Sequence, residues 1–70
     1  MSAHYSVQQQ RILDLLRAHA GSDVHLPLIL DLRIGSYTRR IHELRRKGHD
    51  IRMTDWWVGT QRHTAYKLVE

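Results

Sequence analysis

The sequence predicts an α+β fold in which three helices precede a β-hairpin, and three observations support this prediction. Apolar residues recur at helical spacing over roughly the first two thirds of the chain. Gly21, Gly35 and Gly48 interrupt that pattern and mark the ends of the helical segments. After Gly48 the apolar residues alternate with polar ones, as they do in strands. The 70 residues suffice for one small domain over residues 1–70, in which residues 1–5 are expected to be flexible.

The first helix is predicted to begin at Ser6, because Ser6 and Gln9 have the spacing of a capping box. Gly21 is expected to end this helix, since glycine readily adopts positive φ. The predicted inner face consists of Ile12, Leu15, Leu16 and His19, with Leu13 and Ala20 at its edge. His19 is therefore expected to be packed in the core.

The middle of the chain is predicted to hold a short second helix. Residues 24–26 are a candidate minor strand, and Pro27 suits the first turn of a helix over residues 28–32. A tight turn is expected over residues 34–36. Ser36 is expected to cap the third helix.

The third helix is predicted over residues 36–47 and has a narrow apolar stripe. With Ile41 at its centre, Tyr37 and Leu44 lie within about 60° on the same side. The opposite side carries Arg39, Glu43 and Arg46, flanked by Ser36 and Lys47. This pattern predicts one face against the core and one face in solvent.

The last part of the chain has the alternation of a hairpin. One side of the first strand is predicted to carry Ile51, Met53 and Trp57, and one side of the second strand Thr64, Tyr66 and Leu68. Residues 58–61 are expected to form the tip.

The net charge of +4 lies entirely in the second half of the chain. Residues 1–35 carry three Arg and three Asp, whereas residues 36–70 carry eight Lys or Arg and four Asp or Glu. Five of these cations and one acid fall within the predicted third helix. Such a cluster on one element is typical of a protein that binds a polyanion, the alternative being a solvated helix face.

Several classes of function are not expected. The chain has no cysteine, which excludes disulfides and thiolate zinc sites, and its six histidines lack metal-ligand spacing, so neither a metal nor another cofactor is predicted. No glycine-rich phosphate loop and no facing pair of carboxylates points to an enzyme. No stretch approaches the roughly 18 apolar residues of a membrane span, and residues 1–10 do not form a signal peptide, so a cytoplasmic location is expected.

Two helices joined by a short glycine-containing turn, the second of them basic, match a helix-turn-helix, and the hairpin after them makes it winged. The stretch RIGSYTRRIHELRRKGHDI at residues 33–51 resembles the core of the winged helix-turn-helix proteins of bacteria and phages, and Tyr66, Lys67 and Leu68 resemble the end of their last strand. The resemblance covers residues 6–69. It implies a protein that binds double-stranded DNA, such as a transcription regulator or a phage-type accessory or architectural factor.

The resemblance implies that residues 36–47 enter the major groove as the recognition helix. Arg39 is expected to read guanine, and Glu43 either to accept from cytosine or, as we prefer, to orient Arg39 or Arg46. Backbone phosphates are expected to be bound by Ser36, Thr38, Arg40, Arg46 and Lys47, and the wing is expected to reach the adjacent minor groove or phosphates through Gln61, Arg62 and His63.

The adjacent tryptophans Trp56 and Trp57 must point to opposite faces of a strand. One is expected to cover the core and the other to be exposed, unless both are packed. An exposed tryptophan is typical of an interface, so the alternative function is a protein-interaction module whose partner is a second copy or another protein. Binding of RNA is a weaker alternative, because no RNA-binding motif is present.

Overall fold

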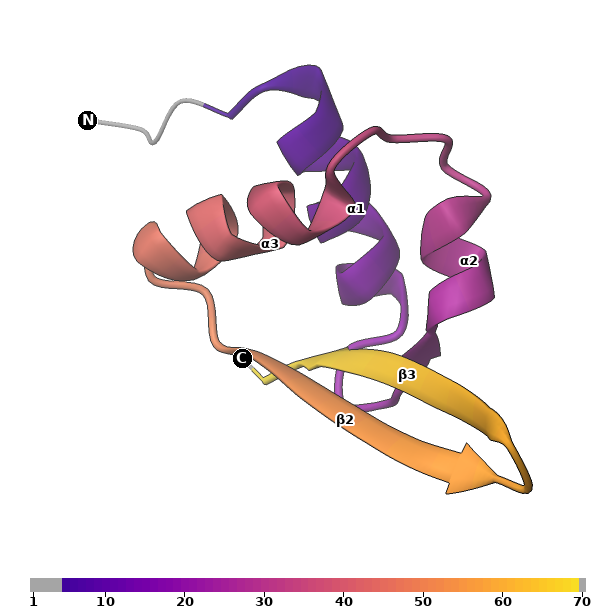
Figure 1. The fold of residues 1–70 in the computed structure, drawn as a ribbon. Coiled ribbons are helices and arrows are strands. Elements are labelled where there is room, and N and C mark those ends of the chain that lie inside the picture. Colours follow the sequence, from indigo (N-terminus) through magenta and orange to yellow (C-terminus); the bar gives the residue numbers. More distant parts are fainter. Residues whose placement is uncertain (1–4, 70) are drawn as a thin grey trace.

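The structure is a computed structural model that describes residues 5–69. Its elements are, in chain order, α1 (Val7–Ala18), β1 (Val24–His25), α2 (Leu26–Leu30), α3 (Tyr37–Arg46), β2 (Ile51–Val58) and β3 (Gln61–Leu68). The predicted order is confirmed, including the minor strand between the first two helices. The three helices lie together on one side of the sheet, and the β2–β3 hairpin extends beyond them (Figure 1). Within the described residues, no helix is long and apolar enough to cross a membrane.

Helix α1 begins with the predicted capping box. The Gln9 backbone N–H donates to the Ser6 hydroxyl, and the Ser6 N–H donates to the Gln9 side-chain oxygen, both at 3.1 Å. The prediction for His19 is wrong, because α1 ends at Ala18 and His19 is an exposed C-cap residue. Leu13, expected at the edge, is fully buried, since α1 packs against both α3 and β3.

The turn between α2 and α3 differs from the expected one. Pro27 lies in the first turn of α2, as predicted, but α2 begins and ends two residues earlier than expected. Ser36 immediately precedes α3, yet its side chain makes no capping hydrogen bond. Its backbone has a φ of 58° in the left-handed region, whereas a capping residue is ordinarily extended. The predicted cap at Ser36 is therefore wrong.

The sheet is antiparallel with the strand order β1–β3–β2. β3 is central, and its pairing with β2 runs without interruption from Ile51 opposite Leu68 to Val58 opposite Gln61. The two-residue turn between the strands contains Gly59 at a φ of 62°, a value that glycine adopts without steric cost.

The core lies between the helices and one face of the sheet. It consists of Ile12, Leu13, Leu16, Val24, Ile29, Ile34, Ile41, Leu44, Ile51, Tyr66 and Leu68. On β2 only Ile51 belongs to it, because the strand then leaves the helices and Met53 is 48 % exposed. The predicted inward side of β2 is therefore buried at its first residue only.

Tyr5 departs from the expected flexible segment over residues 1–5. Its hydroxyl lies 2.7 Å from His49 Nε2, and the Lys47 ammonium lies 4.7 Å from the centre of its ring. These contacts hold Tyr5 against the loop between α3 and β2. Residues 1–4 lie outside the described residues.

Candidate nucleic-acid interface

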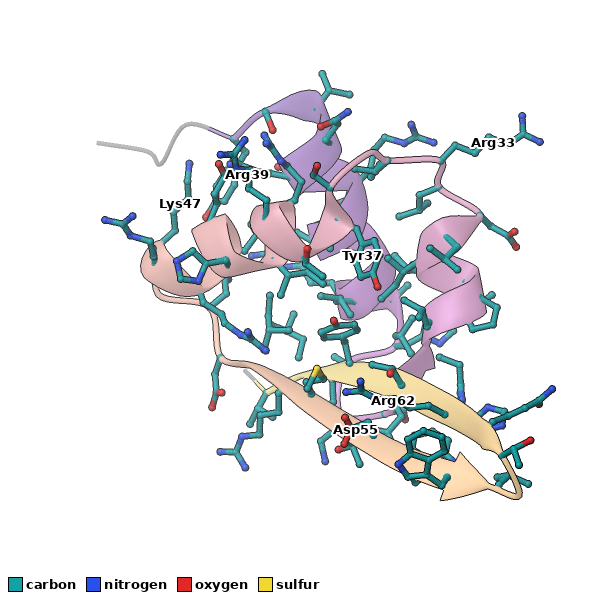
Figure 2. All side chains as sticks on the ribbon, viewed as in Figure 1. Arg33, Tyr37, Arg39, Lys47, Asp55 and Arg62 are labelled. Atoms are coloured by element: carbon teal, nitrogen blue, oxygen red, sulfur yellow. The ribbon has the colours of Figure 1, made fainter. Side chains whose placement is uncertain are left out.

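Helix α3 turns one face to solvent and the other to the core. Ile41 and Leu44 are buried, and Tyr37 is half-buried with its ring edge-on to Tyr66. The exposed side chains of α3 and its C-cap are Thr38, Arg39, His42, Arg45, Arg46 and Lys47. Arg39 and Lys47 project from α3 away from the sheet (Figure 2). Four of these six side chains are cations, so the solvent-facing side of α3 is strongly basic.

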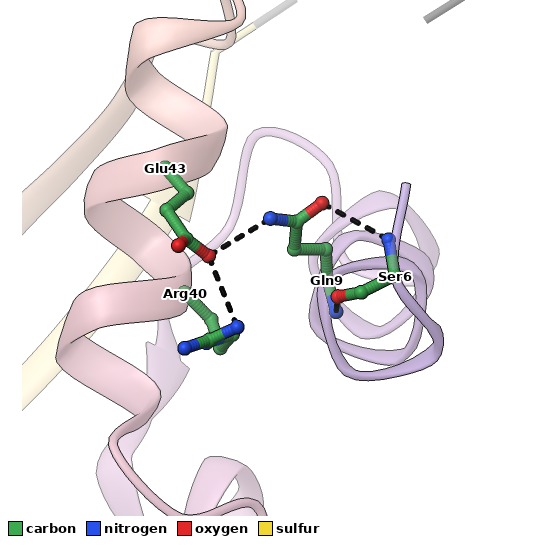
Figure 3. A network of polar contacts seen from close by, with 4 residues as sticks. All are labelled: Ser6, Gln9, Arg40 and Glu43. Carbon is green, nitrogen blue, oxygen red and sulfur yellow. Dashed lines mark hydrogen bonds and ion pairs between the residues drawn. The ribbon is translucent and has the colours of Figure 1, made fainter. Parts of the chain in front are cut away.

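Glu43, the acid of α3, is half-buried at the edge of that basic face, and its carboxylate is turned toward α1 rather than fully outward as predicted. Its carboxylate accepts a hydrogen bond from the Gln9 side-chain nitrogen at 2.8 Å and forms an ion pair with Arg40 at 3.3 Å (Figure 3). Glu43 therefore orients Arg40 rather than Arg39 or Arg46. The hydrogen bond from Gln9 is the main reason why the pKa of Glu43 is lowered, and the nearby cations lower it further.

The network around Glu43 joins α3 to the start of α1. Gln9 is 7 % exposed, and its side chain bonds to the Ser6 backbone at one end and to Glu43 at the other. Arg40 is half-buried, and its Nε is buried without a hydrogen-bond partner. The Arg40 charge is thus balanced by Glu43, whereas the exposed arginines Arg39 and Arg46 form no ion pair with this acid.

Two exposed residues of α3, His42 and Arg45, were not predicted as site residues. His42 lies three residues after Arg39 and four before Arg46, so helical spacing places it between them. That signal was present in the sequence. Arg45 donates from Nε to the Ile51 carbonyl oxygen at 2.8 Å, which ties the end of α3 to the start of β2.

An open hollow of about 280 Å³ lies where α3 meets the start of α1. It is lined by Gln9, Glu43, Arg46 and Lys47. Its two cations lie on the exposed side of the C-terminal part of α3. The hollow therefore belongs to the same basic surface.

The wing carries less available positive charge than the sequence suggested. Arg62 forms an ion pair with Asp55, which lies on the neighbouring strand and on the same face of the sheet. Arg62 is only one residue pair from the tip, but its side chain turns back along the hairpin toward Asp55 (Figure 2). His63 is half-buried with its ring stacked on Trp56 at 5.7 Å, and only Gln61 is an exposed predicted contact without such a partner.

The two tryptophans point to opposite faces of β2, as predicted. Trp56 is half-buried on the face away from the helices, between the rings of His25 and His63. Trp57 lies on the helix-side face but beyond the helices, and it is 68 % exposed. Neither tryptophan covers the core, so that expectation is wrong. The reason is that the hairpin extends past the helical layer.

Within residues 5–69, no cluster of three or more acidic or histidine side chains could hold a metal ion.

Comparison with known families bears on the arrangement of the helices and strands. A family model described as a winged helix-turn-helix domain matches residues 7–69, from the first residue of α1 to the residue after β3. Neither the curated proteins nor the solved structures give a match. Such domains are typically DNA-binding modules rather than enzymes. By the order of its helices and strands and by this match, the chain belongs to the winged helix-turn-helix domain family.

Proposed function

We propose that this protein binds double-stranded DNA by placing the exposed face of α3 in the major groove. The observation that carries the proposal is the separation of charge on α3. Its only acid, Glu43, is turned toward α1, and the exposed side is left to Arg39, Arg45 and Arg46. A helix fits the major groove of B-DNA, and a cationic face neutralises the phosphates on either side of it.

Individual roles are assigned from position on the helix. Arg39, near the start of α3 and fully outward, is the candidate for a bidentate contact to guanine, with His42 one turn further along. Arg46 and Lys47 at the other end are candidates for phosphate contacts, as are Ser36 and Thr38 at the start. Arg40 reaches a phosphate in this proposal only when its ion pair with Glu43 opens.

The wing has a secondary role in this proposal. Gln61 at the tip contacts the adjacent backbone or minor groove, and Arg62 joins it when it leaves Asp55, with His63 nearby. The biological role that fits a small DNA-binding module of this kind is a cytoplasmic transcription regulator or a phage-type accessory or architectural factor.

The experiment is a titration of a labelled duplex of random sequence, followed by fluorescence anisotropy at about 50 and 200 mM salt. If all four exposed cations of α3 and its C-cap contact phosphates, the expected slope of log K against log salt is about −3.6. The variant Arg39→Ala/Arg46→Ala should bind more weakly and with a shallower slope. Arg11→Ala/Arg17→Ala, which removes two exposed arginines of α1, is the matched control. Absence of binding by the parent at low salt would contradict the proposal.

Sequence recognition is tested by the same approach on a selected site. Loss of Arg39 should reduce the preference for that site over random DNA, because a bidentate arginine–guanine contact discriminates by about 1–3 kcal/mol. Loss of Lys47 should weaken binding to both duplexes equally. Equal behaviour of the two variants would show that Arg39 contacts only the backbone.

A second candidate function, protein binding at the wing, is favoured by Trp57. An indole that is 68 % exposed, beside an ion pair that cancels the nearby charge, is suited to a protein surface rather than to a polyanion. Association through this surface should be insensitive to salt and should be lost in Trp57→Ala. The two candidates use different surfaces and do not compete.

A further inference from the structure

Strand β2 has an edge that no other strand of residues 5–69 covers. The strand order β1–β3–β2 places β2 at one side of the sheet, paired with β3 and with no other strand of residues 5–69. In an antiparallel sheet the backbone N–H and C=O groups of an edge strand alternate between its neighbour and the outside. β2 therefore presents a row of unpaired backbone donors and acceptors after Ile51, whose carbonyl oxygen accepts from Arg45.

This edge lacks most of the features that usually prevent strands from pairing with other molecules. Natural edge strands are protected by short length, bulges, proline or charged side chains, and the two charged residues of β2, Arg52 and Asp55, are each neutralised by an ion pair. β2 has eight residues, neither proline nor lysine, and a pairing with β3 that continues without a bulge. Its exposed side chains include Met53, Trp57 and Val58, with exposed fractions of 48, 68 and 59 %. A long, regular and partly apolar edge of this kind is suited to pairing with a further strand.

The charges on β2 favour a second copy of the same chain as that strand. The two charged residues of β2 are Arg52, paired with Asp50 at 3.3 Å, and Asp55, paired with Arg62. Two such neutral edges approach without repulsion, whereas two basic α3 faces repel one another. A copy of β2 also has the same length and, when antiparallel, the complementary order of donors and acceptors.

We propose that two copies of this protein associate through antiparallel pairing of their β2 strands, which joins the two sheets into one of six strands. The interface is isologous, with a twofold axis through the middle of β2. This inference deepens the second candidate function above by naming the partner. The pairing itself does not depend on DNA binding.

The register of this pairing rests on the proposed function in one respect. If both α3 helices contact one DNA duplex, the helices of both copies lie on the same face of the joint sheet. One register that keeps the helices on the same face places Asp55 of one copy opposite Asp55 of the other. This arrangement brings like charges together. The register with Thr54 opposite its own copy avoids this and keeps residues 51–57 of both strands paired.

The first test measures the mass of the protein in solution by sedimentation equilibrium. The parent should have about twice the monomer mass of 8.3 kDa. Thr54→Lys, which places two ammonium groups at the twofold axis, should be monomeric, whereas Gln8→Lys, with the same charge change on the exposed side of α1, should remain dimeric. Circular dichroism confirms that all three are folded. A parent that is monomeric at about 1 mM, or a Thr54→Lys variant that stays dimeric, overturns the proposal.

The second test uses the absence of cysteine in the chain. Residues directly opposite in an antiparallel pair have Cα atoms about 4.5–5.5 Å apart, within the range of a disulfide. Thr54→Cys should therefore be oxidised rapidly to a covalent dimer, whereas Thr60→Cys at the exposed hairpin tip should not. Equal rates for the two variants would refute the register. Binding of a duplex by Thr54→Lys separates the two proposals, because a monomeric variant that still binds DNA shows that the α3 surface acts independently of the β2 edge.

Discussion

The Arg40–Glu43 ion pair gives the sharpest test of how charge is arranged on α3. Glu43 accepts from Gln9 at 2.8 Å and holds Arg40 at 3.3 Å, so one acid keeps one arginine out of the exposed basic face. Glu43→Gln keeps a similar side-chain volume and an oxygen that can accept from Gln9, but it removes the charge that holds Arg40. Arg40 then becomes available to a phosphate.

The size of the effect is set by counterion release. One added phosphate contact steepens the slope of log K against log salt by about 0.9, which corresponds to an additional loss of about threefold in affinity between 50 and 200 mM salt. At the lower salt concentration the variant should bind more tightly than the parent. The measurement is a titration of the same labelled duplex with both proteins, followed by anisotropy.

The control for this prediction is Asp14→Asn. Asp14 is an exposed residue of α1 whose carboxylate accepts from Gln10, so its substitution makes the same change in net charge away from α3. It should change the slope little, because it releases no arginine toward the DNA. If Glu43→Gln keeps the parental slope, or if Asp14→Asn steepens it equally, Arg40 is not held in reserve by Glu43 and the reasoning fails.

Three further predictions concern stability. Ser36→Gly should raise the free energy of unfolding, measured by urea denaturation, by up to about 1 kcal/mol. The reason is that Ser36 has a φ of 58° and its side chain makes no capping hydrogen bond. A decrease would show that the Ser36 hydroxyl stabilises α3. The hydrogen bond from Gln9 lowers the pKa of Glu43 from 4.5, so this contribution to stability is present above pH 4.5 and is lost as the pH falls through the depressed pKa. Glu43→Gln should therefore flatten the acid side of the stability–pH curve, and an unchanged curve would contradict this. Trp56→Ala should destabilise the fold by about 0.5–1.5 kcal/mol more than Trp57→Ala, because only Trp56 is packed against aromatic rings, those of His25 and His63. Equal midpoints of thermal unfolding for the two variants would refute that difference.

The features that could be predicted from the sequence depend on local chemistry. The capping box requires only the spacing of Ser6 and Gln9, and both of its hydrogen bonds are present. The hairpin is indicated by the change of period after Gly48, and its register from Ile51 to Leu68 is regular. These features were accessible because each depends on a few consecutive residues.

The features that were missed depend on how elements pack. A helical projection centred on Ile41 identifies the buried stripe of α3, but it does not show which flank α1 covers. Gln9 approaches from α1 on the flank of Arg40 and Glu43, and this turns the Glu43 carboxylate toward α1. The face of β2 that each tryptophan occupies is set by alternation. How exposed each tryptophan is, however, depends on where the hairpin leaves the helices, and this is a property of the assembled fold.

The pairing of the acids explains why the basic surface is confined to one element. Glu43 pairs with Arg40, Asp50 with Arg52, and Asp55 with Arg62, so each described acid after residue 35 balances one arginine. Arg39, Arg45 and Arg46 lie outside these three ion pairs, and all three are exposed on α3. The same pairing makes β2 electrically neutral. Charge balance therefore separates a face suited to a polyanion from an edge suited to a second copy, so substitutions on β2 should change the mass of the assembly without changing the salt dependence of each α3 contact.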